Sequence, residues 1–160
     1  MKTNKVAVAG ILLFVVAAFA LGVSLYRKHV HSAQDQTVSA EQTRLVRMHS
    51  PILGPQGAPV TIVEFFDPAC ETCRAFYPIV KSLMAKYPED VRLVIRYAPF
   101  HRGSDQVVKL LEAARRQGKY QLVLEAVLQA QPTWADHSQP NPDLTFELSR
   151  AVGLDIERAR

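Results

Sequence analysis

Cys70 and Cys73 are the only cysteines in the chain, and two residues separate them. Residues 60–66, before them, are apolar and rich in β-branched and aromatic side chains, which predicts a buried strand. Residues 74–86, after them, predict a helix. A Cys-x-x-Cys pair at such a junction places its first sulfur at a helix N-terminus, where unpaired N–H groups and the helix dipole stabilise a thiolate. The pattern therefore favours thiol–disulfide exchange.

The order of the two cysteines along the helix predicts their roles. Cys70, at the helix N-terminus, is the expected nucleophile, and Cys73, about one turn further in, is expected to resolve the mixed disulfide. Glu71 lies between them and opposes thiolate formation by like-charge repulsion, on the order of 1 kcal/mol at a surface-like dielectric. We expect a milder oxidant than a pair with a basic residue between its cysteines.

Two other uses of the pair stay open. A structural disulfide would close so short a loop that it would add little stability. A zinc site needs four ligands, but the chain has no second cysteine pair, and none of its five histidines has ligand spacing to a cysteine. The sequence thus predicts that the cysteine pair is the redox agent, with no metal and no organic cofactor.

Glu64 interrupts the apolar strand six residues before Cys70. A carboxyl group buried there would have a raised pKa and could relay a proton to or from Cys73. The alternative is a charge at the strand end that faces solvent. His101, which follows the second predicted strand, is expected to be a loop or packing residue.

The surrounding elements predict an α/β fold. Residues 91–97 alternate apolar and polar side chains and predict a second strand. A helical crossover between two strands makes them parallel, in a right-handed βαβ unit. Residues 51–59 contain three prolines and two glycines, which predicts a loop and a domain boundary.

The chain from residue 104 onward predicts helices. Ser104 is a candidate cap for the first of them, Asn141 followed by a proline predicts a later helix start, and Gly153 predicts its end. Only two strands are evident, and a two-stranded sheet is marginally stable by itself.

The N-terminal region predicts a membrane segment. Residues 6–26 carry no formal charge and are long enough to cross a hydrocarbon core of ~30 Å. We predict a transmembrane anchor over residues 1–28, with a cleaved signal sequence as the alternative. Residues 29–50 are polar and predict a spacer, in which Ser39 is expected to begin a short helix that ends near His49.

The net charge of +4 comes from the flanks of the apolar segment. All acidic residues lie at Asp35 or later, and the basic excess is accounted for by the four residues Lys2, Lys5, Arg27 and Lys28. The rest of the chain is balanced, which argues against nucleic-acid binding through a clustered basic face.

Residues 54–97, and above all 62–78, resemble the thioredoxin superfamily and specifically its DsbA-like branch. That branch has an acidic residue six positions before the first cysteine, where this chain has Glu64. Thioredoxin-fold proteins commonly have a proline five positions after the second cysteine, where this chain has Pro78. The resemblance implies a thioredoxin-like βαβ unit with a helical insertion over about 104–153.

The resemblance also implies an extracytoplasmic protein disulfide oxidoreductase. Its substrates would be protein thiols and disulfides, and a membrane redox partner would recycle it. The expected location is the cell membrane, with a single pass and the redox domain in the periplasm. The alternatives are a metal-handling protein of the copper-delivery type, although that family uses Cys-x-x-x-Cys, and a non-catalytic interaction domain.

One feature of the family is missing from the sequence. DsbA-like proteins carry a cis-proline in a strand after the insertion, and it contacts the cysteines and binds substrate. Pro132 comes too early to match it, and the closing strands and last helix have no counterpart. We therefore expect residues 51–160 to be an incomplete DsbA-like domain, truncated at its C-terminus.

Overall fold

The computed structural model describes the backbone of residues 3–159, with side chains outside residues 3, 5, 6 and 31–43. The chain divides into two compact units, Met1–Arg47 and Met48–Arg160. The first unit consists of helix α1 (Thr3–Leu45). Within α1, the segment Ala7–Val30 has a mean hydropathy of 2.7 and enough length to cross a membrane, and a signal sequence near the N-terminus would have the same properties.

Helix α1 continues through the predicted polar spacer as far as Leu45. The expectation of a separate helix from Ser39 to about His49 was wrong. The physical reason is that no glycine or proline occurs between Gly22 and Pro51, so no residue in this stretch breaks the helix.

The second unit is built on a mixed sheet of strand order β1-β3-β2. Strands β2 (Val60–Phe66) and β3 (Val91–Tyr97) are parallel, with Val63 opposite Val94. Helix α2 (Glu71–Lys86) connects them, so the predicted βαβ unit is confirmed. The cysteines lie where β2 leads into α2.

Strand β1 (Ile52–Leu53) lies in a segment that the sequence assigned to a loop. It pairs antiparallel with β3, with Ile52 opposite Val94. Two residues are too few to show an alternating pattern, and Pro51 and Gly54 flank them. Gly54 has a φ of +92°, and a Cβ there would lie 2.9 Å from the carbonyl oxygen of Val91, so the turn after β1 requires glycine.

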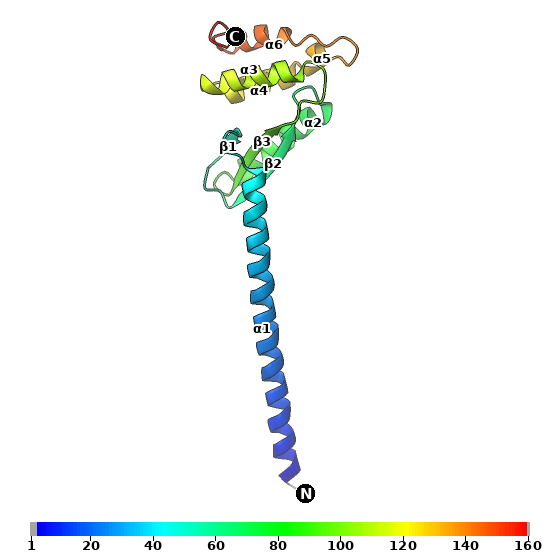
Figure 1. The fold of residues 1–160 in the computed structure, drawn as a ribbon, viewed down its shortest axis with the longest axis vertical. Helices are drawn as coiled ribbons and strands as arrows, with labels where there is room; N and C mark the ends of the chain where they lie inside the picture. Colours follow the sequence, from blue (N-terminus) through cyan, green and yellow to red (C-terminus); the bar gives the residue numbers. More distant parts are fainter. Residues whose placement is uncertain (1–2, 160) are drawn as a thin grey trace. The chain divides into compact units, whose positions relative to one another are not determined.

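The remaining helices lie after β3, in the region where the sequence predicted helices. They are α3 (Ser104–Arg116), α4 (Tyr120–Gln129), α5 (Gln131–Trp134) and α6 (Leu144–Ala151). Figure 1 shows α3 and α4 side by side, with α6 packed on the side of α4 away from the sheet. A single core joins sheet and helices; its fully buried side chains include Phe66, Leu93, Ile95, Leu111, Leu124, Val127 and Trp134.

Two predicted helix caps are wrong. Ser104 does not cap α3 with its side chain, because its hydroxyl donates a hydrogen bond to Asp67 instead. Helix α6 begins at Leu144 rather than next to Asn141, because residues 141–143 form a turn in which the Leu144 N–H donates to the Asn141 carbonyl at 3.2 Å. Gly153 follows α6 with a φ of +89°, in keeping with the predicted stop.

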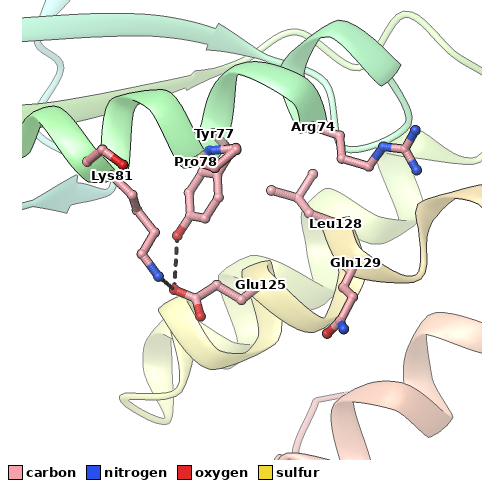
Figure 2. Close-up of a pocket in the computed structure, with 8 residues that line it drawn as sticks. Arg74, Tyr77, Pro78, Lys81, Glu125, Leu128 and Gln129 are labelled. Atoms are coloured by element: carbon pink, nitrogen blue, oxygen red, sulfur yellow. Dashed lines mark hydrogen bonds and ion pairs between the residues drawn. The ribbon is translucent and has the colours of Figure 1, made fainter.

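Helix α2 is held against α4 by a small polar bridge. The Tyr77 hydroxyl and the Lys81 ammonium both donate to Glu125 Oε1, at 3.3 and 2.9 Å. Figure 2 shows these side chains reaching across a hollow of about 410 Å³, with Leu128 on its wall. The bridge lies one to three turns beyond the cysteines and fixes the helix that carries them.

Candidate redox site

Cys70 is the N-cap residue of α2, with φ −76° and ψ 120°. Its N–H donates to the Asp67 carbonyl at 3.1 Å, and its own carbonyl accepts from the Arg74 N–H at 3.1 Å. The Cys70 side chain makes no capping hydrogen bond. The half-buried Cys70 thiol therefore lies at the positive end of the helix dipole.

Cys73 lies in the first turn of α2 and packs against the core. Burial raises the pKa of its thiol to about 11, and the neighbouring Cys70 and the charge of Glu64 contribute in the same direction. A hydrogen bond from the backbone of Asp67 opposes this shift. Cys73 is consequently a thiol at neutral pH.

Glu64 lies on β2 and is half-buried. Burial raises its pKa, and its charge raises the pKa of the Cys73 thiol. Its Oε2 atom is buried and has no hydrogen-bond partner among the described residues. Glu64 is thus a partly buried carboxyl group rather than a solvated charge at the strand end, and its charge acts on the Cys73 thiol.

Asp67 is a hydrogen-bond centre that the sequence analysis missed. It is only 4% exposed, and its Oδ1 accepts from the Ala69 N–H and the Ser104 hydroxyl. Its Oδ2 accepts from the N–H groups of Phe100 and His101, at 2.7 and 2.9 Å, and contacts His101 Nδ1 at 2.8 Å. Burial alone would raise the pKa of Asp67, but the hydrogen bonds from Ser104, His101 and Ala69 together lower it.

Gln131 ties the helical insertion to the cysteine loop. It is 2% exposed, and its Nε2 donates to the carbonyl oxygens of Pro68 and Cys70 at 2.8 and 3.0 Å. The sequence drew attention only to its neighbour Pro132, which lies in the first turn of α5. A glutamine before a proline carries no signal of such a contact.

Glu71 is also held by a residue that the sequence analysis did not select. Its Oε1 lies 2.6 Å from Nε2 of His137, in the loop after α5. Its pKa is lowered, first by a bond from its own backbone N–H and then by His137. The predicted repulsion between Glu71 and a Cys70 thiolate therefore comes from a carboxylate that already has a partner.

A Cys-x-x-Cys pair at the N-terminus of a helix, directly after a parallel strand, is typical of the thioredoxin-like fold found in thiol–disulfide oxidoreductases. The family model described as Thioredoxin matches residues 47–156. The chain belongs to this family.

Solved structures agree with this assignment. A thioredoxin-like oxidoreductase from Silicibacter pomeroyi is 35% identical, with a TM-score of 0.60, over 71% of this chain and 62% of that one. Oxidised BdbD from Bacillus subtilis is 25% identical, with a TM-score of 0.57, over 64% and 58%. α-DsbA1 from Wolbachia pipientis, at 18% identity and a TM-score of 0.60 over 72% and 59%, shares the fold. The DsbA-like resemblance is confirmed.

Curated relatives of the chain include much longer proteins. A Na⁺/H⁺ antiporter NhaA from Herminiimonas arsenicoxydans is 31% identical over 107 residues, which are 67% of this chain and 16% of that protein. An NhaA from Mycolicibacterium gilvum is 26% identical over 157 residues, 93% of this chain and 24% of that protein. The chain spans less than a quarter of the length of these relatives.

Proposed function

We propose that this protein exchanges disulfides with protein thiols through Cys70 and Cys73. The observation that carries the proposal is the asymmetry of the pair. Cys70 is the N-cap residue of α2 and its side chain makes no capping bond, whereas Cys73 is packed against the core with its pKa raised to about 11. One sulfur is placed to attack and the other is kept as a thiol until needed.

In the reducing direction, the Cys70 thiolate attacks one sulfur of a substrate disulfide. A mixed disulfide forms and the other substrate sulfur leaves as a thiolate. Cys73 then loses its proton and attacks Cys70 Sγ, which releases the second substrate thiolate and leaves a Cys70–Cys73 disulfide. Two electrons pass to the substrate. In the oxidising direction every step is reversed, and Cys73 leaves as a thiolate that must be protonated.

Glu64 is the proposed proton carrier for Cys73. A thiol with a pKa near 11 needs a base before it can attack, and Glu64 is the buried carboxylate whose charge acts on it. The unpartnered Oε2 atom is free to accept that proton, directly or through one water. The raised pKa of Glu64 brings it closer to neutral pH, where a proton relay works in both directions.

We place the redox domain outside the cytoplasm, in the periplasm, with α1 as a single-pass anchor in the cell membrane. The apolar segment Ala7–Val30 and the DsbA-like fold support this. A membrane redox protein would then recycle the cysteine pair. Fusing alkaline phosphatase after residue 160 in a bacterial host tests the orientation: we expect an active enzyme in the membrane fraction, and an inactive fusion would contradict it.

The test of the chemistry uses the full chain in detergent and a fluorescent peptide disulfide. Cys70→Ser is expected to abolish exchange. Cys73→Ser is expected to form a mixed disulfide with the peptide that persists and is visible by mass. Thr72→Ser, a conservative change between the cysteines, serves as the matched control and should exchange normally. Unchanged exchange by Cys70→Ser would overturn the proposal.

A further inference from the structure

Three potential metal ligands from distant parts of the chain meet beside the cysteine loop. Glu71 is in the first turn of α2, His101 follows β3, and His137 lies in the loop after α5. One ligand atom from each lies within 4.8 Å of the other two. The rings of His101 and His137 are in edge contact, with centroids 5.6 Å apart.

The first reason to regard this cluster as a metal site is the support behind His101. Its Nδ1 contacts Oδ2 of the buried Asp67 at 2.8 Å. This contact occupies Nδ1, so Nε2 is the ring nitrogen available to an ion. This is the carboxylate–histidine arrangement that orients metal-binding imidazoles in proteins.

The second reason is the contact between the other two members. Glu71 Oε1 and His137 Nε2 are 2.6 Å apart, which is hydrogen-bond distance. A metal ion with tetrahedral bonds of about 2.0–2.1 Å holds its ligands ~3.3 Å apart. These two side chains are largely exposed, so a small outward movement lets an ion replace the proton between them.

We propose that Glu71, His101 and His137 form a binding site for a divalent zinc ion. Two imidazole nitrogens and one carboxylate oxygen are a donor set typical of zinc, with a fourth position left to water or an external ligand. The single negative charge of the three ligands, together with Asp67 behind His101, offsets the two positive charges of the ion.

The surroundings leave room for that fourth ligand. Glu71 and His137 line a hollow of about 360 Å³, whose wall also includes Gln131 and the charged residues Arg74 and Asp136. Asp136 Oδ1 is already bonded to Ser138 and Gln139, which removes it as a ligand atom. Gln131 has a buried Oε1 with no partner among the described residues, and it lies on this same wall.

The inference goes beyond thiol exchange and does not depend on it. None of the three ligands is a cysteine, although Glu71 stands between the two. The site would therefore bind zinc in the oxidised and the reduced protein. The sequence did not predict this site because its ligands are remote from one another along the chain: His137 is 66 residues from Glu71.

The test removes the thiols, because thiolates bind zinc by themselves. The full chain with Cys70→Ser and Cys73→Ser, in detergent and without a histidine tag, is titrated with zinc chloride by calorimetry. We expect one equivalent to bind. His101→Ala and His137→Ala should each weaken binding by more than about 10-fold, since even the loss of an outer partner costs that much. Glu71→Gln should weaken it as well.

His49→Ala, which removes an exposed histidine outside the cluster, is the matched control and should bind as the parent does. Circular dichroism checks that each variant is folded. Cobalt(II) in place of zinc gives a second readout, a visible absorption band of tetrahedral type that is lost in His137→Ala. Absence of zinc binding, or equal binding by the double variant His101→Ala/His137→Ala, would overturn the site and leave the thiol-exchange proposal untouched.

Discussion

The buried carboxylate of Asp67 and the imidazole of His101 are joined by a 2.8 Å contact between Oδ2 and Nδ1. It links the loop after β2 to the end of β3, and the backbone N–H groups of Phe100 and His101 bind the same oxygen. Since the pKa of Asp67 is lowered, the carboxylate is ionised and the His101 ring must donate. One side chain thus sets both the loop conformation and the histidine tautomer.

Asp67→Asn should destabilise the domain by about 3 kcal/mol at pH 7, because an amide places donors where an ionised acceptor met several N–H and O–H groups. The pKa of Asp67 is lower in the folded protein than in the unfolded one. The stability that this adds is present above the unfolded-state pKa and is lost as the pH falls through the folded-state pKa. The difference from the parent should therefore shrink in acid. Urea unfolding at pH 7 and pH 3 measures this difference in free energy. A loss at pH 7 no larger than that of the exposed Asp90→Asn would contradict a stabilising role for the hydrogen bonds to Asp67.

The Cys73 thiol should ionise only in strong alkali. In the Cys70→Ser variant, we expect the rate of alkylation by iodoacetamide to rise with a midpoint well above the ordinary thiol value, because burial is the main cause of a pKa near 11. Adding Glu64→Gln should lower that midpoint, since a negative charge is removed. The same variant unfolded in urea is the reference, and equal midpoints in the two states would contradict the burial of Cys73.

Glu64 should make stability fall as pH rises. Its folded pKa is raised above the unfolded value, so its contribution is fully present below the unfolded pKa and is lost as pH rises through the folded one. Glu64→Gln, which imitates the protonated form, should match the parent at pH 4 and exceed it in free energy of unfolding at pH 7. The exposed Glu89→Gln should show no such divergence, and parallel curves for both variants would exclude a buried Glu64.

Gln131→Ala should cost about 2 kcal/mol, because it leaves the buried Pro68 carbonyl without this donor and removes one of two donors from the Cys70 carbonyl, which keeps the Arg74 N–H. Gln129→Ala, two residues earlier and exposed, is the matched comparison and should be close to neutral. Urea unfolding of both variants in detergent gives the two free energies. Equal losses would mean that the bonds from Gln131 contribute nothing net.

The βαβ unit was predictable because its signals are local. Residues 60–66 and 91–97 have strong strand character, and the cysteine pair marks where the first strand leads into a helix. For Glu64 the sequence left a buried and a solvent-facing position open, and the structure shows a half-buried side chain. Strand β1 was not predictable, because two residues are too few to show an alternating pattern and they form a strand only by pairing with β3.

The polar framework of the site could not be predicted, because its partners are remote in sequence. Asp67 binds groups more than 30 residues away, and Gln131 reaches Cys70 across 61 residues. Ser104 illustrates the difficulty: its type and position fit a helix cap, yet tertiary structure directs its hydroxyl to Asp67. Side chains with several possible partners take the one that the fold brings near.

Because Glu71 contacts His137, the Cys-Glu-Thr-Cys motif does not have the same properties when it is moved to another protein. Grafting these four residues onto another thioredoxin scaffold would transfer the acidic side chain without the imidazole that accompanies it here. The original and the grafted protein would then have the same four residues but a different charge distribution beside the cysteines. In this protein the charge on the tetrapeptide depends also on the loop after α5, because that loop carries His137.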